Sequence, residues 1–180
     1  MTVQLIPWDE IPNFPLYIDQ VVAIIDDTLE FLPRNEGDKT ITNTMINNYV
    51  KAGIVPPPEK KRYTRDHVAY FIVICLLKRV YSLDEISKLF RLQILKSSTE
   101  VAYKKFCNIF EYYINNEDDV AVYVDPEHHD RTDLFIKVIR SVVFKVRVQM
   151  EIADEMTLQE ERKEINMQEK IARKGKKKAA

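Results

Sequence analysis

The residues best suited to chemistry are side-chain amides and cations that lie close together between positions 43 and 65. An asparagine can bond an adenine edge through two atoms, and threonine, lysine or arginine can reach phosphates or base edges in a DNA groove. The pattern therefore predicts contacts with double-stranded DNA. The predicted DNA-binding residues are Asn43, Thr44, Asn47, Asn48, Tyr49, Lys51, Lys60, Lys61, Arg62, Tyr63 and Arg65.

Charge supports this prediction only locally, because the 180-residue chain as a whole has a formal net charge of -1. Residues 39–65 contain six basic side chains and a single acid, Glu59. A local cationic patch on a nearly neutral protein is typical of a surface that docks on phosphates. Charge alone leaves open a second interpretation, a solvated surface run without a partner.

No pattern in the sequence indicates catalysis. We find no Ser-His-Asp set, no pair of catalytic carboxylates and no glycine-rich phosphate loop, so we expect no catalytic residue, no cofactor and no enzymatic activity. His128, His129, Asp130 and Asp133 carry atoms that bind zinc. Adjacent histidines point to opposite sides of a helix or strand, so we expect the start of a helix there and no metal site. A titratable cluster inside a pocket would support the rival interpretation, a small-molecule enzyme.

The two cysteines, Cys75 and Cys107, lie in apolar segments, which predicts buried free thiols in a reducing compartment. The first residues have no basic stretch followed by an apolar one, so no signal peptide is expected. The longest apolar stretch, residues 68–77, is shorter than the roughly 20 residues that span a membrane. We therefore expect a cytoplasmic protein that does not enter a membrane.

Hydrophobic periodicity and a content of only three glycines predict an all-α fold. Residues 1–15 are expected to form an arm that packs on the body, and residues 120–124 a short strand or an extended link. Helices are expected over residues 16–32, 42–52, 64–80, from 82 onward, 98–114 and 131–172.

Several residues mark the ends of these helices. Thr42, Thr64 and Ser82 are expected as N-caps, with Ser82 and Glu85 forming a capping box, and Gly53 is expected to end the second helix. Prolines at 56–58 predict an extended path through the basic residues that follow. A short helix, an extended basic turn and a second pair of helices together predict a helix-turn-helix with a short wing.

The predicted domains are an N-terminal arm (1–15), a DNA-binding domain (16–93), a helical dimerisation or effector region (97–172) and a basic tail (173–180). The long last helix has a wider apolar face than a short core needs, so we expect a homodimer through it. The aromatic residues at 103, 106, 110, 112 and 113 are more typical of a core than of a pocket. A small-molecule effector would be expected between the fifth helix and the last one.

Residues 42–90 resemble the DNA-binding half of MerR-type regulators. In that family a helix that ends in tyrosine and then Gly-Leu precedes a proline-containing wing, an Arg-x-Tyr-Ser/Thr element and a Phe-Ser-Leu-x-Glu-Ile helix start. Most of the chain is similar to a family of uncharacterised bacterial proteins with a MerR-like N-terminal half. The residues that match the motif are Tyr49, Gly53, Ile54, Pro56, Tyr63, Thr64, Ser82, Leu83, Glu85 and Ile86.

The resemblance implies a winged helix-turn-helix over residues 16–93 and a transcriptional regulator that binds DNA sequence-specifically. The chain departs from the motif where Asn47 and Asn48 stand in place of an arginine and an aromatic residue, and where Lys61 replaces the wing arginine. Lysine keeps the charge but not the planar fork of arginine. The alternative is a helical protein-interaction module on the same scaffold that does not bind DNA.

Overall fold

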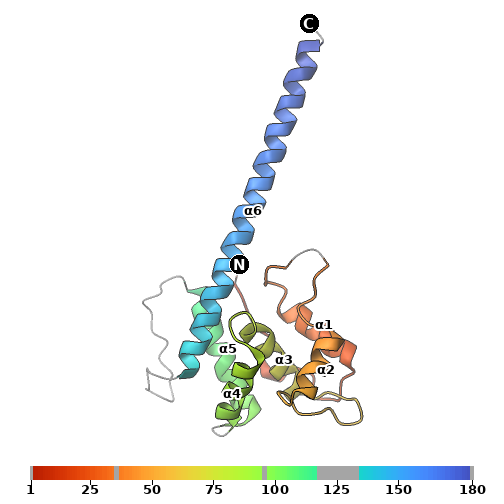
Figure 1. The fold of residues 1–180 in the computed structure, drawn as a ribbon, viewed down its shortest axis with the longest axis vertical. Helices are drawn as coiled ribbons and strands as arrows, with labels where there is room; N and C mark the ends of the chain where they lie inside the picture. The colour runs from red at the N-terminus through yellow and green to blue at the C-terminus, as the bar shows by residue number, and fades with distance from the viewer. Residues whose placement is uncertain (1, 35–36, 95–96, 117–133, 179–180) are drawn as a thin grey trace. The chain divides into compact units, whose positions relative to one another are not determined.

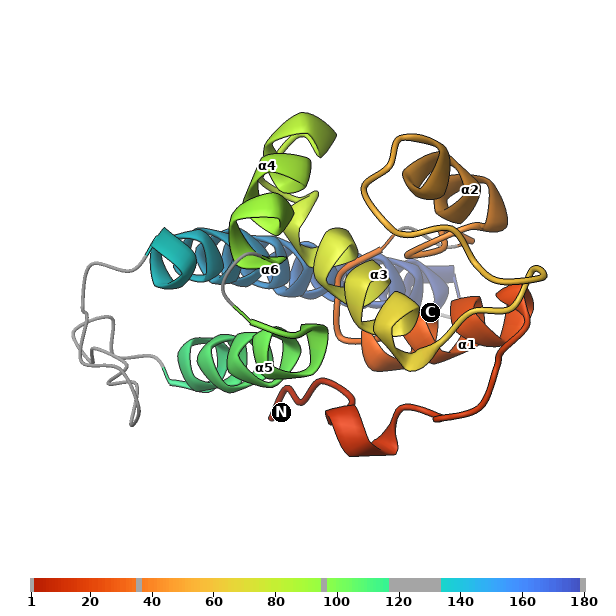
Figure 2. The same cartoon turned by 90° about the horizontal axis from the view of Figure 1, so that it is seen from below.

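The computed structural model describes residues 2–34, 37–94, 97–116 and 134–178. In this part of the chain the secondary structure is helical, with isolated bridges and no strand, which confirms the predicted all-α class. The chain divides into two compact units, Met1–Val146 and Arg147–Ala180. Figures 1 and 2 show the elements, which are η1 (Trp8–Glu10), α1 (Ile18–Thr28), α2 (Asn43–Lys51), α3 (Arg65–Leu77), α4 (Leu83–Ile94), α5 (Thr99–Asn115) and α6 (Leu134–Lys178).

Helix α3 forms the centre of the first unit. Nine of its thirteen residues are buried, on all sides of the helix, as expected for a helix that is apolar all round. Helices α1 and α5 both pack against it (Figure 2). Phe71, Ile72 and Ile74 are fully buried, and burial of each such side chain contributes about 1.5–3 kcal/mol. The other helices of this unit are therefore arranged around α3.

The N-terminal arm lies along α5, which confirms the predicted packing of the arm on the body. The Asn115 side chain bonds both backbone groups of Val3 at 2.8 Å. The Leu5 N–H donates to Glu111 Oε1 at 2.9 Å. The arm also supplies apolar side chains to the core, so it is a structural part of the unit; the buried ones are Val3, Leu5, Trp8 and Ile11.

The predicted helix caps are present. Thr42 Oγ1 accepts the backbone N–H of Met45 at 3.3 Å. The Glu85 carboxylate accepts both the backbone N–H and the hydroxyl of Ser82, at 2.8 and 2.7 Å. Gly53 follows α2 with a φ of 67°, the left-handed conformation that glycine adopts at the lowest cost. These local interactions fix where α2 and α4 begin and where α2 ends.

His67 caps the N-terminal turn of α3. The Thr64 N–H donates to His67 Nδ1 at 3.0 Å, so Nε2 carries the ring proton and donates to the Pro56 carbonyl, 3.2 Å away. His67 is buried. Burial lowers the pKa of the His67 imidazole, although the Pro56 carbonyl and the Asp66 charge act in the opposite direction. The ring therefore has a structural role, because it joins the start of α3 to the loop after α2.

Some boundaries differ from those predicted. Helix α1 ends at Thr28 rather than at 32, and the Thr28 hydroxyl bonds the Ile24 carbonyl at 2.7 Å. The expected division between residues 93 and 97 does not coincide with the boundary of the first unit, since α5 packs on α3. Residues 120–124 and the zinc-type residues His128, His129, Asp130 and Asp133 lie outside the described residues.

The apolar face of α6 is largely used inside the first unit. Ile139, Val142 and Val146 are fully buried there, so a pairing of two copies through α6 would have to use other residues of the helix. In the second unit, no described side chain between Arg147 and Gln168 is buried. None of the helices in the described ranges combines the length and apolarity that a membrane crossing needs.

We expect His67→Gln to make stability less dependent on pH in mildly acidic solution. Because burial holds the folded-state pKa of His67 below the ordinary value of 6.5, the unfolded chain takes up the proton first as the pH falls. The native chain is then destabilised progressively below that value. Glutamine keeps an acceptor for the Thr64 N–H but does not titrate.

Urea unfolding at intervals between about pH 5 and 7 measures this effect. The wild-type chain should lose stability more steeply towards acid than the glutamine variant. Parallel curves for the two proteins would show that His67 does not contribute to acid sensitivity.

Candidate nucleic-acid interface

Helix α2 turns an apolar side to the core and a polar side to solvent. Ile46 and Tyr49 are buried. On the opposite side the helix carries short polar side chains and one lysine, all exposed, as the sequence predicted. Such a face can enter a groove because no bulky side chain blocks the approach of the helix. The exposed residues are Asn43, Thr44, Asn47, Asn48 and Lys51.

Asn43 differs from the other two asparagines because it has a partner within the protein. Its amide nitrogen donates to Asp19 Oδ1 on α1, at 2.9 Å. The Asp19 carboxylate takes up a hydrogen-bond donor of the Asn43 amide. It also adds a negative charge at this edge of the face, which would repel a nearby phosphate. Asn47 and Asn48 are therefore the stronger candidates for base contacts.

The basic residues after α2 form a tight two-residue turn. The Arg62 N–H donates to the Glu59 carbonyl at 2.8 Å, and an isolated antiparallel bridge joins these two residues. Lys60 and Lys61, between them, have φ values of 47° and 61°. Two consecutive positive φ values define a type I′ turn, in which asparagine and glycine are the usual residues. Two exposed lysines therefore stand at the tip in a conformation that is strained for lysine.

This turn is anchored to the chain segment that precedes α1. Leu16 and Tyr63 exchange two backbone hydrogen bonds, of 2.8 and 2.9 Å. The Arg62 guanidinium lies over the Tyr17 ring, 3.3 Å from its centroid, and bonds the Tyr17 hydroxyl. Sequence reasoning did not select Tyr17, since only the bridge between residues 16 and 63 brings it to the turn. Tyr17 holds Arg62 in place, and its side chain is 57% exposed.

Besides Asn43 and Arg62, three further predicted contact residues are engaged within the protein. Tyr49 and Tyr63 are 2% and 4% exposed, so a duplex cannot reach either side chain, and this part of the predicted contact set is corrected. The Tyr49 hydroxyl accepts from Lys78 Nζ at 3.1 Å. Arg65 donates through Nε to the Ile11 carbonyl at 2.8 Å. Its guanidinium also lies over the Trp8 ring, so Arg65 fastens the arm to α3.

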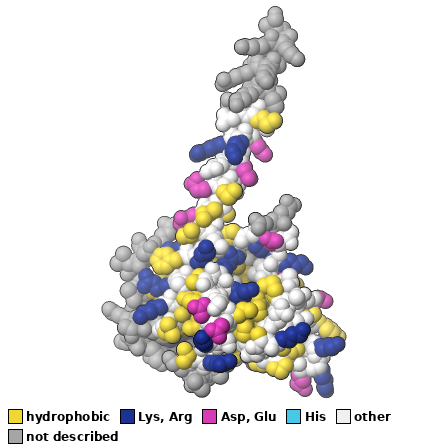
Figure 3. Space-filling model, viewed as in Figure 1, with side chains coloured by type: hydrophobic (Ala, Val, Ile, Leu, Met, Phe, Trp, Pro, Cys, Tyr) yellow, Lys and Arg dark blue, Asp and Glu magenta, His cyan; other side chains and the backbone are white. Residues whose placement is uncertain are grey.

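The loop that carries the turn lies beside α2 in both ribbon views (Figures 1 and 2). Figure 3 shows Lys and Arg side chains spread over the visible face of the first unit, some of them at the end that carries α1 and α2. The link between α2 and α3, from Ala52 to Thr64, is longer than the three or four residues of a compact helix-turn-helix. The polar helix and the basic turn are therefore neighbours in space. The loop that connects α2 to α3, however, is not the short turn of a compact helix-turn-helix.

The cysteines confirm the prediction of buried free thiols. Cys75 and Cys107 are both buried and unpaired. Burial raises the pKa of both thiols to about 12, so little of either is present as the reactive thiolate near neutral pH. Within the described ranges no group of three or more histidine, cysteine or acidic side chains is placed to hold a metal ion.

The molecule is thus a small helical protein with a candidate site made of an amide-bearing helix and a strained basic turn. Residues 6–110 match a domain of unknown function, DUF1836. The match covers more than half of the chain, and the chain belongs to the DUF1836 family. No curated protein and no solved structure matches it.

We expect replacement of the two strained lysines, Lys60→Asn with Lys61→Gly, to stabilise the protein by about 1 kcal/mol. Asparagine and glycine adopt positive φ at a lower cost than lysine, and the double change creates the preferred sequence of a type I′ turn. Urea unfolding of both proteins gives the difference in the free energy of unfolding.

The control is Lys61→Ala, which removes a charge without relieving the backbone. It should give no stabilisation, because alanine is also disfavoured at positive φ. If the double variant were no more stable than the wild type, the turn would not be strained.

Proposed function

We propose that this chain binds double-stranded DNA, with the polar face of α2 in the major groove and the turn at Lys60 and Lys61 on the phosphate backbone. The observation that carries the proposal is the strained turn. Strained backbone is commonly retained where it serves a function. Here it holds two lysines at an exposed tip beside a helix whose outer face carries three amides, one hydroxyl and one lysine.

Two groups of residues have different roles in this proposal. Lys60 and Lys61 contact phosphates and supply affinity that is independent of sequence, together with Lys51. Asn47 and Asn48 contact base edges and supply sequence preference, since an asparagine amide matches the donor and acceptor of adenine. Tyr17 and Arg62 act indirectly by fixing the turn.

The MerR resemblance supports the same docking, and the family assignment to DUF1836 is neutral towards it. The motif that carries the resemblance includes Tyr49 and Tyr63, which are core residues and so support the fold of this segment rather than a contact with DNA. By this proposal the protein regulates transcription through occupancy of a promoter.

We propose in addition that two copies pair through the second unit. Val148, Ile152 and Met156 recur at intervals of four residues on α6 and are 49%, 56% and 58% exposed. Residues at this spacing form one apolar stripe along a helix. A symmetric dimer would place two polar helices on a roughly palindromic DNA site.

We expect the Lys60→Asn, Lys61→Gly double variant to bind all duplexes more weakly than the wild type. It removes two phosphate contacts but improves the turn, so its weaker binding cannot be attributed to unfolding. The slope of log affinity against log salt should fall by about 1 for each lysine. Fluorescence anisotropy with a labelled random-sequence duplex at several salt concentrations measures both effects.

The matched control for charge is the double variant Lys137→Ala, Lys145→Ala, which removes two exposed lysines of α6. It should keep the wild-type salt slope. Equal slopes for both double variants would refute the assignment of phosphate contacts to the turn.

Sequence preference is tested on the genomic sites found by mapping the tagged protein across its host genome. On such a site Asn47→Ala and Asn48→Ala should each lose about 1–3 kcal/mol of binding, with random-sequence binding retained. Asn108→Ala, an exposed asparagine on α5, should have no effect. Absence of any occupied genomic site would favour the protein-interaction module instead.

For the dimer, we expect Ile152→Glu to shift the protein from dimer to monomer in analytical ultracentrifugation. A charge in the middle of the apolar stripe would be left without a partner in the paired state. Glu155→Gln, on an exposed neighbouring position, should leave the dimer intact. A wild-type protein that sediments as a monomer at all concentrations would contradict the pairing.

A further inference from the structure

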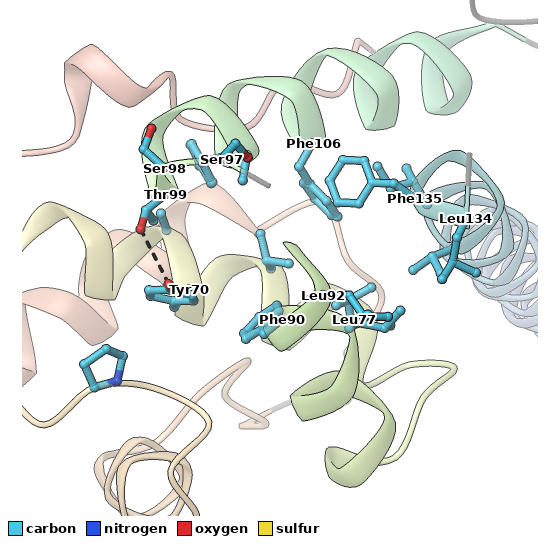
Figure 4. Close-up of a pocket in the computed structure, with 18 residues that line it drawn as sticks. Tyr70, Leu77, Phe90, Leu92, Ser97, Ser98, Thr99, Phe106, Leu134 and Phe135 are labelled. Atoms are coloured by element: carbon cyan, nitrogen blue, oxygen red, sulfur yellow. Dashed lines mark hydrogen bonds between the residues drawn. The ribbon is translucent and has the colours of Figure 1, made fainter. Parts of the chain in front are cut away.

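The first unit contains a cavity of about 670 Å³ lined by α3, α4, α5 and the start of α6 (Figure 4). The cavity is partly open to solvent, since the lining residues Leu92 and Leu134 are about half exposed. Pockets that bind small molecules typically measure about 300–1,000 Å³. The size of this cavity falls within that range.

Aromatic rings line the cavity as two pairs. Tyr70 of α3 and Phe90 of α4 have ring centroids 5.3 Å apart, and Phe106 of α5 and Phe135 of α6 are 6.3 Å apart. Figure 4 shows these two pairs on different sides of the cavity. Phe106 was expected from the sequence to belong to the core. It is buried, and it also contributes to the cavity wall.

The polar groups of the wall lie at one end. Ser97, Ser98 and Thr99 lie together there, away from Leu134 and Phe135 (Figure 4). The Thr99 hydroxyl donates to the Tyr70 hydroxyl at 3.5 Å, which leaves the Tyr70 proton able to bond an acceptor on a ligand. None of the described residues that line the cavity has a charged side chain.

We propose that this cavity binds an uncharged, largely apolar small molecule with a hydroxyl or carbonyl oxygen at one end. The apolar body lies between the two aromatic pairs, and the oxygen accepts from Tyr70. A charged ligand is excluded, because an ion transferred into an apolar wall without a counter-charge is strongly disfavoured. Leu92 and Leu134, which line the cavity and are 51% and 52% exposed, form the rim through which it enters.

The site is independent of the proposed DNA contacts, since none of the exposed amides or lysines assigned to DNA lines it. Pro56 does line it, and this residue belongs to the loop that carries the basic turn. Ligand binding is measured here without DNA, so the two proposals fail or succeed separately.

N-Phenyl-1-naphthylamine, a neutral apolar dye that fluoresces on leaving water, is the test probe. We expect saturable binding of one dye per chain and displacement by decan-1-ol. Decanoate, with a chain of the same length and a charged end, should displace the dye at least about tenfold more weakly. Equal or better displacement by decanoate would overturn the proposed ligand class, and no saturable binding would overturn the site.

Variants locate the dye. Ala102→Trp fills the cavity from α5 and should abolish dye binding, whereas Val101→Trp, at the adjacent position that is 55% exposed, should not. Tyr70→Phe keeps the shape of the wall; it should bind the dye normally but decan-1-ol several-fold more weakly. This variant tests the site even if Ala102→Trp unfolds the chain.

The remaining outcomes are also decisive. Dye binding that is equal in the Ala102→Trp variant and the wild type would place the dye elsewhere and refute the site. Dye binding that falls as protein concentration rises would mean that a second copy covers the cavity, which also contradicts a small-molecule ligand.

Discussion

The burial of α3 on all sides, with nine of its thirteen residues buried, is the constraint on which the rest of the first unit depends. A helix that is apolar on every side must be enclosed, so α1, α5 and the N-terminal arm are held around it. The start of this helix is fixed by the bond from Thr64 to His67, and the same ring holds Pro56. Tyr63, just before the helix, is bonded to Leu16. The exposed basic turn thus lies between two residues that are held in place, Pro56 and Tyr63. Its own lysines contribute nothing to the core.

Cations close in sequence have separate roles in this arrangement. Arg65 is bonded to the Ile11 carbonyl and Arg62 to the Tyr17 ring and hydroxyl, so both arginines stabilise the fold. Lys60 and Lys61 have positive φ values, which lysine adopts at a cost, and remain exposed. The proposed function assigns phosphate binding to the two lysines, for which the fold has no other evident use. The apolar cavity, which none of these charges lines, offers a second and chemically distinct kind of recognition.

Local signals in the sequence predicted the helices, their caps and the outward face of α2, because each depends on residues a few positions apart. The positions of Tyr49 and Tyr63 were misjudged, since a polar hydroxyl at the end of an aromatic ring does not reveal which part is buried. The role of Tyr17 depends on a contact between distant segments, which no local pattern encodes. The cavity lies partly between the fifth helix and the last one, where an effector was expected from the sequence, but its walls on α3 and α4 were not expected. The sequence showed that the apolar face of α6 is wider than a short core needs, but not which part the chain itself covers, which is the part up to Val146.

The most direct test of the central claim is a titration of the isotope-labelled protein with a duplex of about two helical turns, followed through backbone amide chemical shifts. If α2 and the turn form one DNA-binding surface, the amides of Asn47, Asn48, Lys60 and Lys61 should shift together, and that of Lys145 on α6 should not. Shifts confined to other helices, or no shift at low salt, would contradict the account.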